Sequence, residues 1–256
     1  MFQYLIVISP LGLLYGSAGR FLSPENLVGR SGTSFPPSAA TLSGLYAAHS
    51  TDDLKDLQLA GPFWAYSDDP QNFYVPMPFN YLVENGKIKH QLSWNSDLKE
   101  WQTEEGESPT GKFDKGNTWV AIAQWDNPQQ AHTNPWQYLP HLHPRLKLEE
   151  RRVDVDRNRG SLFLENAVQM NPDTCLIYLA NIPIENGWYR FGGEGHMVDL
   201  QCIKIADAIE QRLKKSVGDR FALITPAVWG SNRLSYREPI CLEQLYEVMP
   251  CESLAA

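Results

Sequence analysis

Short apolar runs, separated by segments rich in glycine and proline, predict many strands along this chain. The run FQYLIVIS at 2–9 predicts a buried first strand, and TCLIYLANI at 174–182 predicts another. The segment HMVDLQCIKI at 196–205 alternates apolar and polar residues, which is typical of a half-buried strand. Shorter apolar runs predict further strand-like segments at 57–64, 73–78, 118–125, 188–191 and 221–229.

Two segments have the spacing of helices. The segment SAATLSGLYAAH at 38–49 begins with a serine that can cap a helix, and its Leu42, Leu45 and Tyr46 share one face. The segment ADAIEQRLKKSVG at 206–218 has apolar residues one turn apart, two lysines near its end and a terminal glycine, which together predict a helix. Because strands outnumber helices and do not alternate with them regularly, the pattern predicts an α+β fold.

Polar and proline-rich segments divide the chain. Residues 10–37 are dense in Gly, Ser and Pro, which is the composition of a long irregular loop. Residues 84–117 are polar and acidic, so we expect them to project from the fold as an insertion. Residues 126–147 contain several prolines and are interpreted as a linker. We therefore expect an N-terminal domain over 1–147, which carries the insertion, and a C-terminal domain over 148–256.

The charge balance argues against a broad attraction to nucleic acid. The 256 residues carry a formal net charge of −8, whereas non-specific binding to phosphates depends on Lys and Arg. The acidic residues are concentrated in the centre of the chain, however, and residues 1–51 contain Arg20 and Arg30 against only Glu25. This composition is therefore compatible with local contact to phosphates near the N-terminus.

No disulfide framework, metal or cofactor is expected. The four cysteines are sparse and lack the close pairs of a zinc site. Two of them, Cys175 and Cys202, lie in apolar runs, where a free cysteine behaves as a small core residue. His132, His141 and His143 lack a further ligand at a useful spacing. These features indicate a reduced, cytoplasmic protein.

The apolar run at the N-terminus is interpreted as a strand and not as a signal peptide. No Lys or Arg precedes it, and Pro10 interrupts it early. No later segment approaches the ~20 consecutive apolar residues that a membrane-spanning helix needs. We therefore expect no contact with a membrane.

Five blocks of sequence follow one another in a specific order. They are GRFLSPENLVGRSGTSFPPSAATLSGLYAA (19–48), LAGPFWAY with YVPMPFNYLV (59–83), RRVDVDRNRGSLFLENAV (151–168), WYRFGGEGHMVDL (188–200) and ALITPAVWGSNR (222–233). In content and order these blocks resemble the third subunit of the type III-B CRISPR effector (the Cmr complex), which belongs to the RAMP superfamily. Together the blocks touch nearly the whole chain.

The resemblance implies tandem ferredoxin-like (RRM-related) domains. Members of the family continue into further strands after the last block, whereas this chain ends soon after it, so we expect the second domain to be truncated. The resemblance also implies a subunit of antiviral defence that has no catalytic residues and no cofactor. Such a subunit holds the 5′ tag of the CRISPR RNA and docks to the large polymerase-type subunit and to other RAMP subunits.

Candidate RNA-binding residues surround the first predicted helix. Arg20 and Arg30 are the only cations of the preceding loop, and an arginine can pair with phosphate or stack on a base. A helix that opens at Ser38 presents backbone N–H groups and a positive dipole end to a phosphate. A capped packing helix is an equally good interpretation of Ser38. Further hydroxyl donors in this region are Ser34, Thr41 and Ser43.

The run FGGEGH resembles the glycine-rich loop of the superfamily. Gly192, Gly193 and Gly195 lack side chains, so their backbone N–H groups can approach an RNA backbone. His196 directly follows and can hydrogen-bond or stack with RNA, although a plain hairpin turn before a strand is the alternative. Two weaker RNA-binding candidates, in a stretch of mixed charge, are Arg151 and Arg157.

Two other functions stay open. His49, at the end of the first predicted helix, can act as the general base of a metal-independent endoribonuclease that processes CRISPR repeats, although the sequence shows no partner beside it. A carbohydrate-binding β-rich module is the second alternative, because exposed tryptophans stack on sugars. Its platforms would be Trp64, Trp94, Trp119, Trp125 and Trp188.

Overall fold

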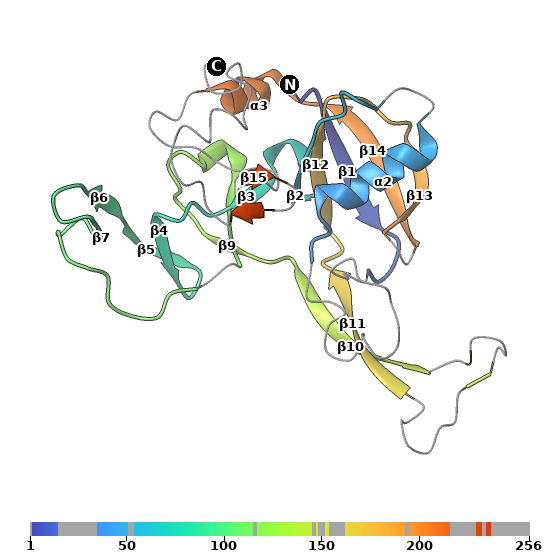
Figure 1. Ribbon diagram of the computed structural model, residues 1–256, viewed down its shortest axis with the longest axis horizontal. Helices are drawn as coiled ribbons and strands as arrows, with labels where there is room; N and C mark the ends of the chain where they lie inside the picture. The colour runs from blue at the N-terminus through green and yellow to red at the C-terminus, as the bar shows by residue number, and fades with distance from the viewer. Residues whose placement is uncertain are drawn as a thin grey trace.

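One large antiparallel sheet dominates the computed structural model, which describes residues 2–14, 35–50, 54–114, 117–144, 147, 152–153, 162–192, 195–215, 229–231 and 234–236. Figure 1 shows this sheet with helix α2 across it and two groups of strands that project from it. The strands of the sheet are β1 (Tyr4–Pro10), β2 (Leu59–Tyr66), β3 (Tyr74–Pro76), β8 (Thr118–Ala121), β9 (His132–Thr133), β12 (Thr174–Ala180), β13 (Gly187–Phe191) and β14 (His196–Lys204).

The remaining strands form two-stranded hairpins, and the helices are short. The hairpins are β4 (Tyr81–Glu84) with β5 (Lys87–Gln91), β6 (Ser93–Asn95) with β7 (Glu100–Gln102), β10 (Trp136–Pro144) with β11 (Leu162–Met170), and β15 (Trp229–Ser231) with β16 (Leu234–Tyr236). The described helices are α2 (Ala39–His49) and α3 (Asp207–Lys214), with 3₁₀ turns η1 (Pro70–Asn72) and η2 (Ile122–Gln124). The predicted α+β class is therefore confirmed.

Strand β1 lies inside the sheet, whose strand order is β13-β14-β1-β12-β2-β3-β8-β9. Tyr4 pairs with Ala180 of β12 on one side and with Lys204 of β14 on the other, and both pairings are antiparallel. Both neighbours of β1 thus come from the part of the chain after residue 147. The described residues on either side of that predicted boundary share one sheet.

The central strands are buried on both faces of the sheet. On β1, Ile6 and Ile8 belong to the core cluster under α2, whereas Leu5 and Val7 belong to a second cluster on the opposite face. All seven residues of β12 are buried. Successive side chains of a strand point to opposite faces, so an uninterrupted apolar run fits a strand that is covered on both sides.

Each face of the sheet receives side chains from one helix. The predicted apolar face of α2 is confirmed, since Leu42, Leu45 and Tyr46 are buried against the first cluster. Tyr46 also donates a hydrogen bond from its hydroxyl to the carbonyl of Ile182, with an O–O distance of 2.7 Å. Ile209 of α3 packs into the second cluster. The two amphipathic segments found in the sequence therefore close the two cores.

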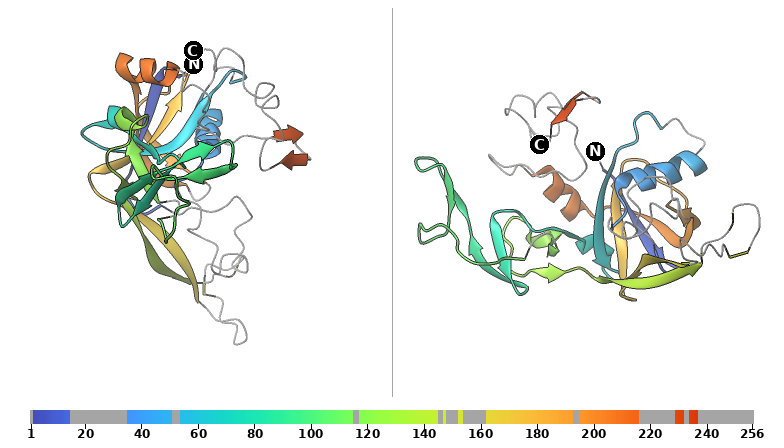
Figure 2. Two further views of the ribbon diagram at one scale, coloured as in Figure 1. Left: turned by 90° about the vertical axis from the view of Figure 1, so that its left-hand side faces the viewer. Right: turned by 60° about the horizontal axis from the view of Figure 1, so that its bottom comes forward.

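The predicted linker at 126–147 is wrong, because half of it forms strands β9 and β10. In β10, Pro140 pairs with Asn166 and Pro144 with Leu162 of β11. Proline cannot donate to a ladder, but in a two-stranded hairpin each strand is an edge, so a proline can occupy a position that needs no donor. The β10–β11 hairpin projects well beyond the sheet (Figures 1 and 2).

The polar segment predicted as an insertion at 84–117 contains most of two small hairpins, β4–β5 and β6–β7. These hairpins lie to one side of the main sheet in Figures 1 and 2.

The strand predicted at 118–125 ends earlier, at Ala121, where η2 begins. The strand predicted at 221–229 falls almost entirely outside the described residues. None of the described helices is long and apolar enough to cross a membrane.

Leu176→Ala tests the double-sided core. Leu176 is fully buried in β12, so its truncation should leave a cavity and lower the free energy of unfolding by about 2–5 kcal/mol. Urea unfolding followed by tryptophan fluorescence measures this change. Leu142→Ala on β10 is the control, because Leu142 is exposed and its loss should cost less than about 0.5 kcal/mol. Equal losses in the two variants would contradict the central position of β12.

Candidate nucleic-acid interface

The first turn of α2 holds three of the predicted RNA-binding residues. Ser38 is exposed, has an extended backbone and makes no side-chain capping hydrogen bond. Its carbonyl accepts a hydrogen bond from the backbone N–H of Thr41 at 2.9 Å. The hydroxyl of Ser43 donates to the carbonyl of Ala40 at 2.8 Å, so its proton is used within the helix. Ser38 and Thr41 are therefore the better donors to an external anion.

The chain is held firmly where it enters α2. The buried hydroxyl of Tyr178 donates to the carbonyl of Pro37, with an O–O distance of 2.6 Å. The ring of Phe35 packs edge-on against Trp136 of β10, with ring centroids 5.0 Å apart. Contacts from β12 and β10 thus fix Pro37 and Phe35, which lie just before the helix, so an anion bound at the helix start meets a preorganised backbone.

The glycine turn joins β13 to β14. Gly192 and Gly195 have φ values of 78° and 66°, and the N–H of Gly195 donates to the carbonyl of Gly192 at 3.1 Å. Positive φ is easy only for glycine, which explains the residue type at both positions. Gly193 lies outside the described residues. His196 opens β14 opposite Phe191.

The glycine turn and the start of α2 lie side by side. A Cβ built on Gly192 would lie 4.0 Å from the Cγ2 atom of Thr41. Helix α2 also contacts β13 at its other end, where His49 packs edge-on against Tyr189 with ring centroids 4.9 Å apart. The structure therefore brings Thr41, in the first turn of α2, beside Gly192 of the glycine turn, 151 positions later in the sequence.

Arg190 was missed as a candidate and lies beside the glycine turn. It is exposed, and its Cδ atom is 3.6 Å from a Cβ built on Gly195. No acidic side chain among the described residues forms an ion pair with it. The sequence could have predicted the exposure of Arg190 from its position in WYRFGG. It lies between Tyr189 and Phe191, which pack in the core, and successive side chains of a strand point to opposite faces.

Besides Gly193, five further predicted residues fall outside the described residues, but the described residues that flank one of these segments are informative. Leu14 forms a bridge with Val168 of β11, through N–O distances of 2.9 and 2.6 Å, and Phe35 contacts β10. The segment between Leu14 and Phe35 therefore starts and ends beside the β10–β11 hairpin. The candidates outside the described residues are Arg20, Arg30, Ser34, Arg151 and Arg157.

The histidines considered as metal ligands do not gather into a site. His132 packs against Tyr74, with ring centroids 4.7 Å apart, and burial lowers its pKa below the ordinary value for histidine. Within the described part of the chain, no group of three His, Cys, Asp or Glu side chains could hold a metal ion. Cys175 is fully buried, and burial raises the pKa of its thiol to about 11. The cysteine is a core residue, as predicted.

Three of the five tryptophans considered as sugar-binding platforms lie in or against the cores of the sheet. Trp64 and Trp119 are only 2% and 7% exposed, and Trp64 stacks on Tyr74 with ring centroids 4.0 Å apart. Trp125 also packs against the core. The prediction of stacking platforms is therefore wrong for Trp64, Trp119 and Trp125, because the large apolar side chains of a wide sheet fill its two cores, whereas Trp94 and Trp188 are exposed.

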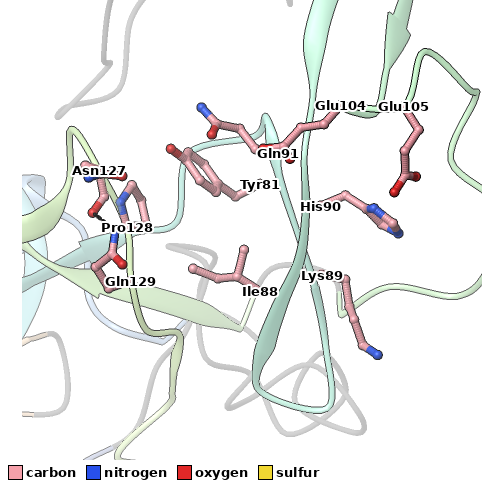
Figure 3. A pocket seen from close by; sticks show the side chains of 10 residues that line it. All are labelled: Tyr81, Ile88, Lys89, His90, Gln91, Glu104, Glu105, Asn127, Pro128 and Gln129. Atoms are coloured by element: carbon pink, nitrogen blue, oxygen red, sulfur yellow. Dashed lines mark hydrogen bonds between the residues drawn. The ribbon is translucent and has the colours of Figure 1, made fainter.

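One open cavity lies at the base of the insertion, on the other side of the molecule from the glycine turn (Figures 1 and 3). Its volume is about 330 Å³. Mostly polar side chains from β5, from the segment after β7 and from the loop before β9 line it, and Figure 3 shows Lys89, His90 and Glu105 on its outer side. Its lining lacks the apolar walls typical of a small-molecule site.

Comparison with known families decides the assignment. A family model described as "CRISPR-associated protein (Cas_Cmr3)" matches residues 13–253. This chain belongs to that family. The resemblance noted for the five sequence blocks is therefore confirmed for the Cas_Cmr3 family. No curated protein matches the chain.

Two solved structures contain chains similar to this Cas_Cmr3 member. One is "Cryo-EM structure of the Type III-B Cmr-beta bound to cognate target RNA and AMPPnP, state 1", with a TM-score of 0.41, 11% identity, and coverage of 77% of this chain and 62% of that chain. The other is "Cryo-EM structure of the Type III-B Cmr-beta bound to cognate target RNA", with a TM-score of 0.38, 11% identity, and coverage of 77% and 63%. The Cas_Cmr3 chain thus spans less than two thirds of the length of either neighbour.

His132 predicts a dependence of stability on pH. Because the folded protein lowers the pKa of His132, the unfolded chain binds the proton more readily, and stability should fall as the pH drops through the ordinary histidine pKa of about 6.5. Thermal unfolding at about pH 7.5 and about pH 5.5 measures the effect. Between these two pH values, the melting temperature of the His132→Phe variant should fall less than that of the wild type. The same loss in both proteins would contradict this account of His132.

Proposed function

We propose that this Cas_Cmr3 member is a non-catalytic, RNA-binding subunit of a type III-B CRISPR effector. It holds the 5′ tag of the CRISPR RNA and docks to the large polymerase-type subunit, beside other RAMP subunits. Membership of the family supports a role in a CRISPR effector. The observation that carries the RNA-binding part is the proximity of the α2 start to the glycine turn, where a Cβ built on Gly192 would lie 4.0 Å from the Cγ2 atom of Thr41.

The chemistry of this interface suits a phosphate chain. The N-terminus of α2 offers backbone N–H groups and the positive end of the helix dipole, which favour an anion. Three of the four residues of the glycine turn, Gly192, Gly193 and Gly195, have no side chain, so an RNA strand can approach their backbone closely. Arg190 adds a cation that can fork onto a phosphate, and Arg20 and Arg30 belong to the segment that ends near α2.

The acidic charge of the protein shapes the expected affinity. With a net charge of −8, the chain has little general attraction for RNA, so binding relies on these few local contacts. We therefore propose modest affinity for isolated guide RNA and tighter binding within the assembled effector. In such an assembly other subunits would supply the charge that this chain lacks.

The family fold enters the proposal as well. Strands β14, β1, β12 and β2 are adjacent and antiparallel, and α2 connects β1 to β2, which matches the strand order and first helix of a ferredoxin-like unit; strand β13, and not a helix, lies between β12 and β14 in the chain. We propose that this unit carries the interface. A second ferredoxin-like unit, truncated or complete, stays a prediction.

The endoribonuclease alternative depends on His49. This residue lies at the last position of an 11-residue helix, about 16.5 Å along the axis from Ser38 at about 1.5 Å per residue. A catalytic base so far from the glycine turn would act on a different part of the RNA. Cleavage of repeat RNA by the purified chain, lost in His49→Ala, would select the nuclease over the non-catalytic subunit.

Gly192→Asp tests the proposed interface. Aspartate tolerates positive φ better than most residues, but it places a carboxylate where the phosphate is proposed to lie, so affinity for tagged guide RNA should fall roughly tenfold. The titration is done on the effector assembled with each variant, because binding is expected to be tight there.

Gly106→Asp is the matched control. Gly106 also has a positive φ, of 80°, and a Cβ at this position would meet no atom within 4 Å, but the residue lies in the insertion. Its variant should bind guide RNA like the wild type. Equal affinity of all three proteins would place the RNA elsewhere.

A further inference from the structure

The β6–β7 hairpin exposes two tryptophans side by side. Trp94 and Trp101 pair directly across the two strands, with ring centroids 5.6 Å apart and an edge-to-face angle of 64°. They are 51% and 50% exposed. Exposed pairs of large aromatic side chains are uncommon on a surface without a partner, and tryptophan is among the residues enriched at the energetic centres of protein interfaces.

The polar face of this hairpin holds it in shape without help from the tryptophans. The side-chain amide of Asn95 donates to Gln102 at 2.9 Å, and that of Gln102 donates to Glu100 at 2.8 Å. The Asn95 side-chain oxygen also accepts hydrogen bonds from the backbone N–H groups of Asp97 and Leu98, at 3.0 and 3.1 Å. These contacts fix the turn, so the opposite face presents two preorganised aromatic rings.

The segment that contains the two tryptophans carries a one-sided charge. Between residues 93 and 107 the only cation is Lys99. The acidic residues of this segment are Asp97, Glu100, Glu104, Glu105 and Glu107. This charge repels phosphate and therefore disfavours RNA as the occupant. It also disfavours a second copy of the same hairpin, because like charges would meet.

We infer that the β6–β7 hairpin is a docking surface for another protein, whose contact face combines an apolar groove with a rim of Lys and Arg. The two tryptophans enter the groove, and the acidic side chains pair with the rim. The inference rests on the proposed function in one respect, since the partner is sought among the other subunits of the CRISPR effector. It deepens that function by naming the surface that docks.

The position of the hairpin agrees with this role. In Figure 1 the β6–β7 hairpin lies at the far end of the insertion, on the side of the molecule away from β13 and α2. A partner bound there leaves the glycine turn accessible. The same chain can thus hold RNA on one side and a protein on the other.

Trp94→Ser with Trp101→Ser, in the full chain, tests the docking surface. Purified effector subunits are the probes, and binding of each subunit to the immobilised chain is measured by biolayer interferometry. We expect at least a hundredfold weaker affinity for one subunit. Trp94→Phe with Trp101→Phe keeps the aromatic faces and should stay within about tenfold of the wild type.

Charge reversal provides an independent arm. Glu104→Lys with Glu105→Lys should slow association with the same subunit about tenfold at low salt, because complementary charge acts mainly on the association rate. Asp68→Lys with Asp69→Lys is the matched control, since these exposed acids lie outside the acidic segment 93–107, and its association rate should match the wild type. Hydrogen exchange shows whether the variant with both tryptophans replaced by serine still forms the β6–β7 hairpin. If that variant unfolds the hairpin, the charge-reversal experiment alone tests the docking surface.

The outcomes separate the docking inference from the proposed function. A wild-type chain that binds none of the effector subunits overturns the proposed function and the choice of partner together. If the wild-type chain binds a subunit, and the serine variant binds it with the same affinity and the charge-reversed variant at the same rate, the inference of this docking surface is wrong but the proposed function stands. In that case the tryptophan pair only stabilises the hairpin.

Discussion

The fold depends on the burial of β1 and β12 between two apolar layers. Each strand gives alternate side chains to the core under α2 and to the opposite core, so neither strand has a face that tolerates polar residues. Because β12 and β14 flank β1, this burial joins the beginning of the chain to a segment more than 160 residues later. A register slip of one residue would exchange the two cores, so the pairing is strongly specified.

That constraint also creates the candidate interface. Helix α2 follows β1 and packs over the first core, while the β13–β14 hairpin extends the same sheet beyond β1. Tyr178 of β12 connects the two parts, because its ring contacts Phe191, at a centroid distance of 6.2 Å, and its hydroxyl holds Pro37. The start of α2 and the glycine turn therefore meet as a consequence of core packing. The peripheral hairpins are free of that constraint, which suits them to contacts with other molecules.

The sequence predicted what depends on local pattern. Continuous apolar runs located β1 and β12, and the spacing of Leu42, Leu45 and Tyr46 identified α2 and its buried face. Prolines misled the interpretation of β10, since their effect depends on whether a strand is an edge, which is a property of the tertiary structure. The meeting of Thr41 with Gly192 could not be predicted either, because no local signal encodes a contact between distant segments. The alternation of residues in WYRFGG could have predicted that Arg190 is exposed. No such pattern predicts that Trp94 is exposed and Trp64 buried.

The central claim is that one rigid sheet presents the start of α2 and the glycine turn to the leading end of a guide RNA. Hydrogen–deuterium exchange on the assembled effector, with and without guide RNA, tests it most directly, because exchange reports the protection of individual backbone segments. The account predicts slower exchange at residues 38–43 and 190–196 on binding, with β1 and β12 strongly protected in both states. Unchanged exchange in those two segments, together with new protection elsewhere in the chain, would contradict it.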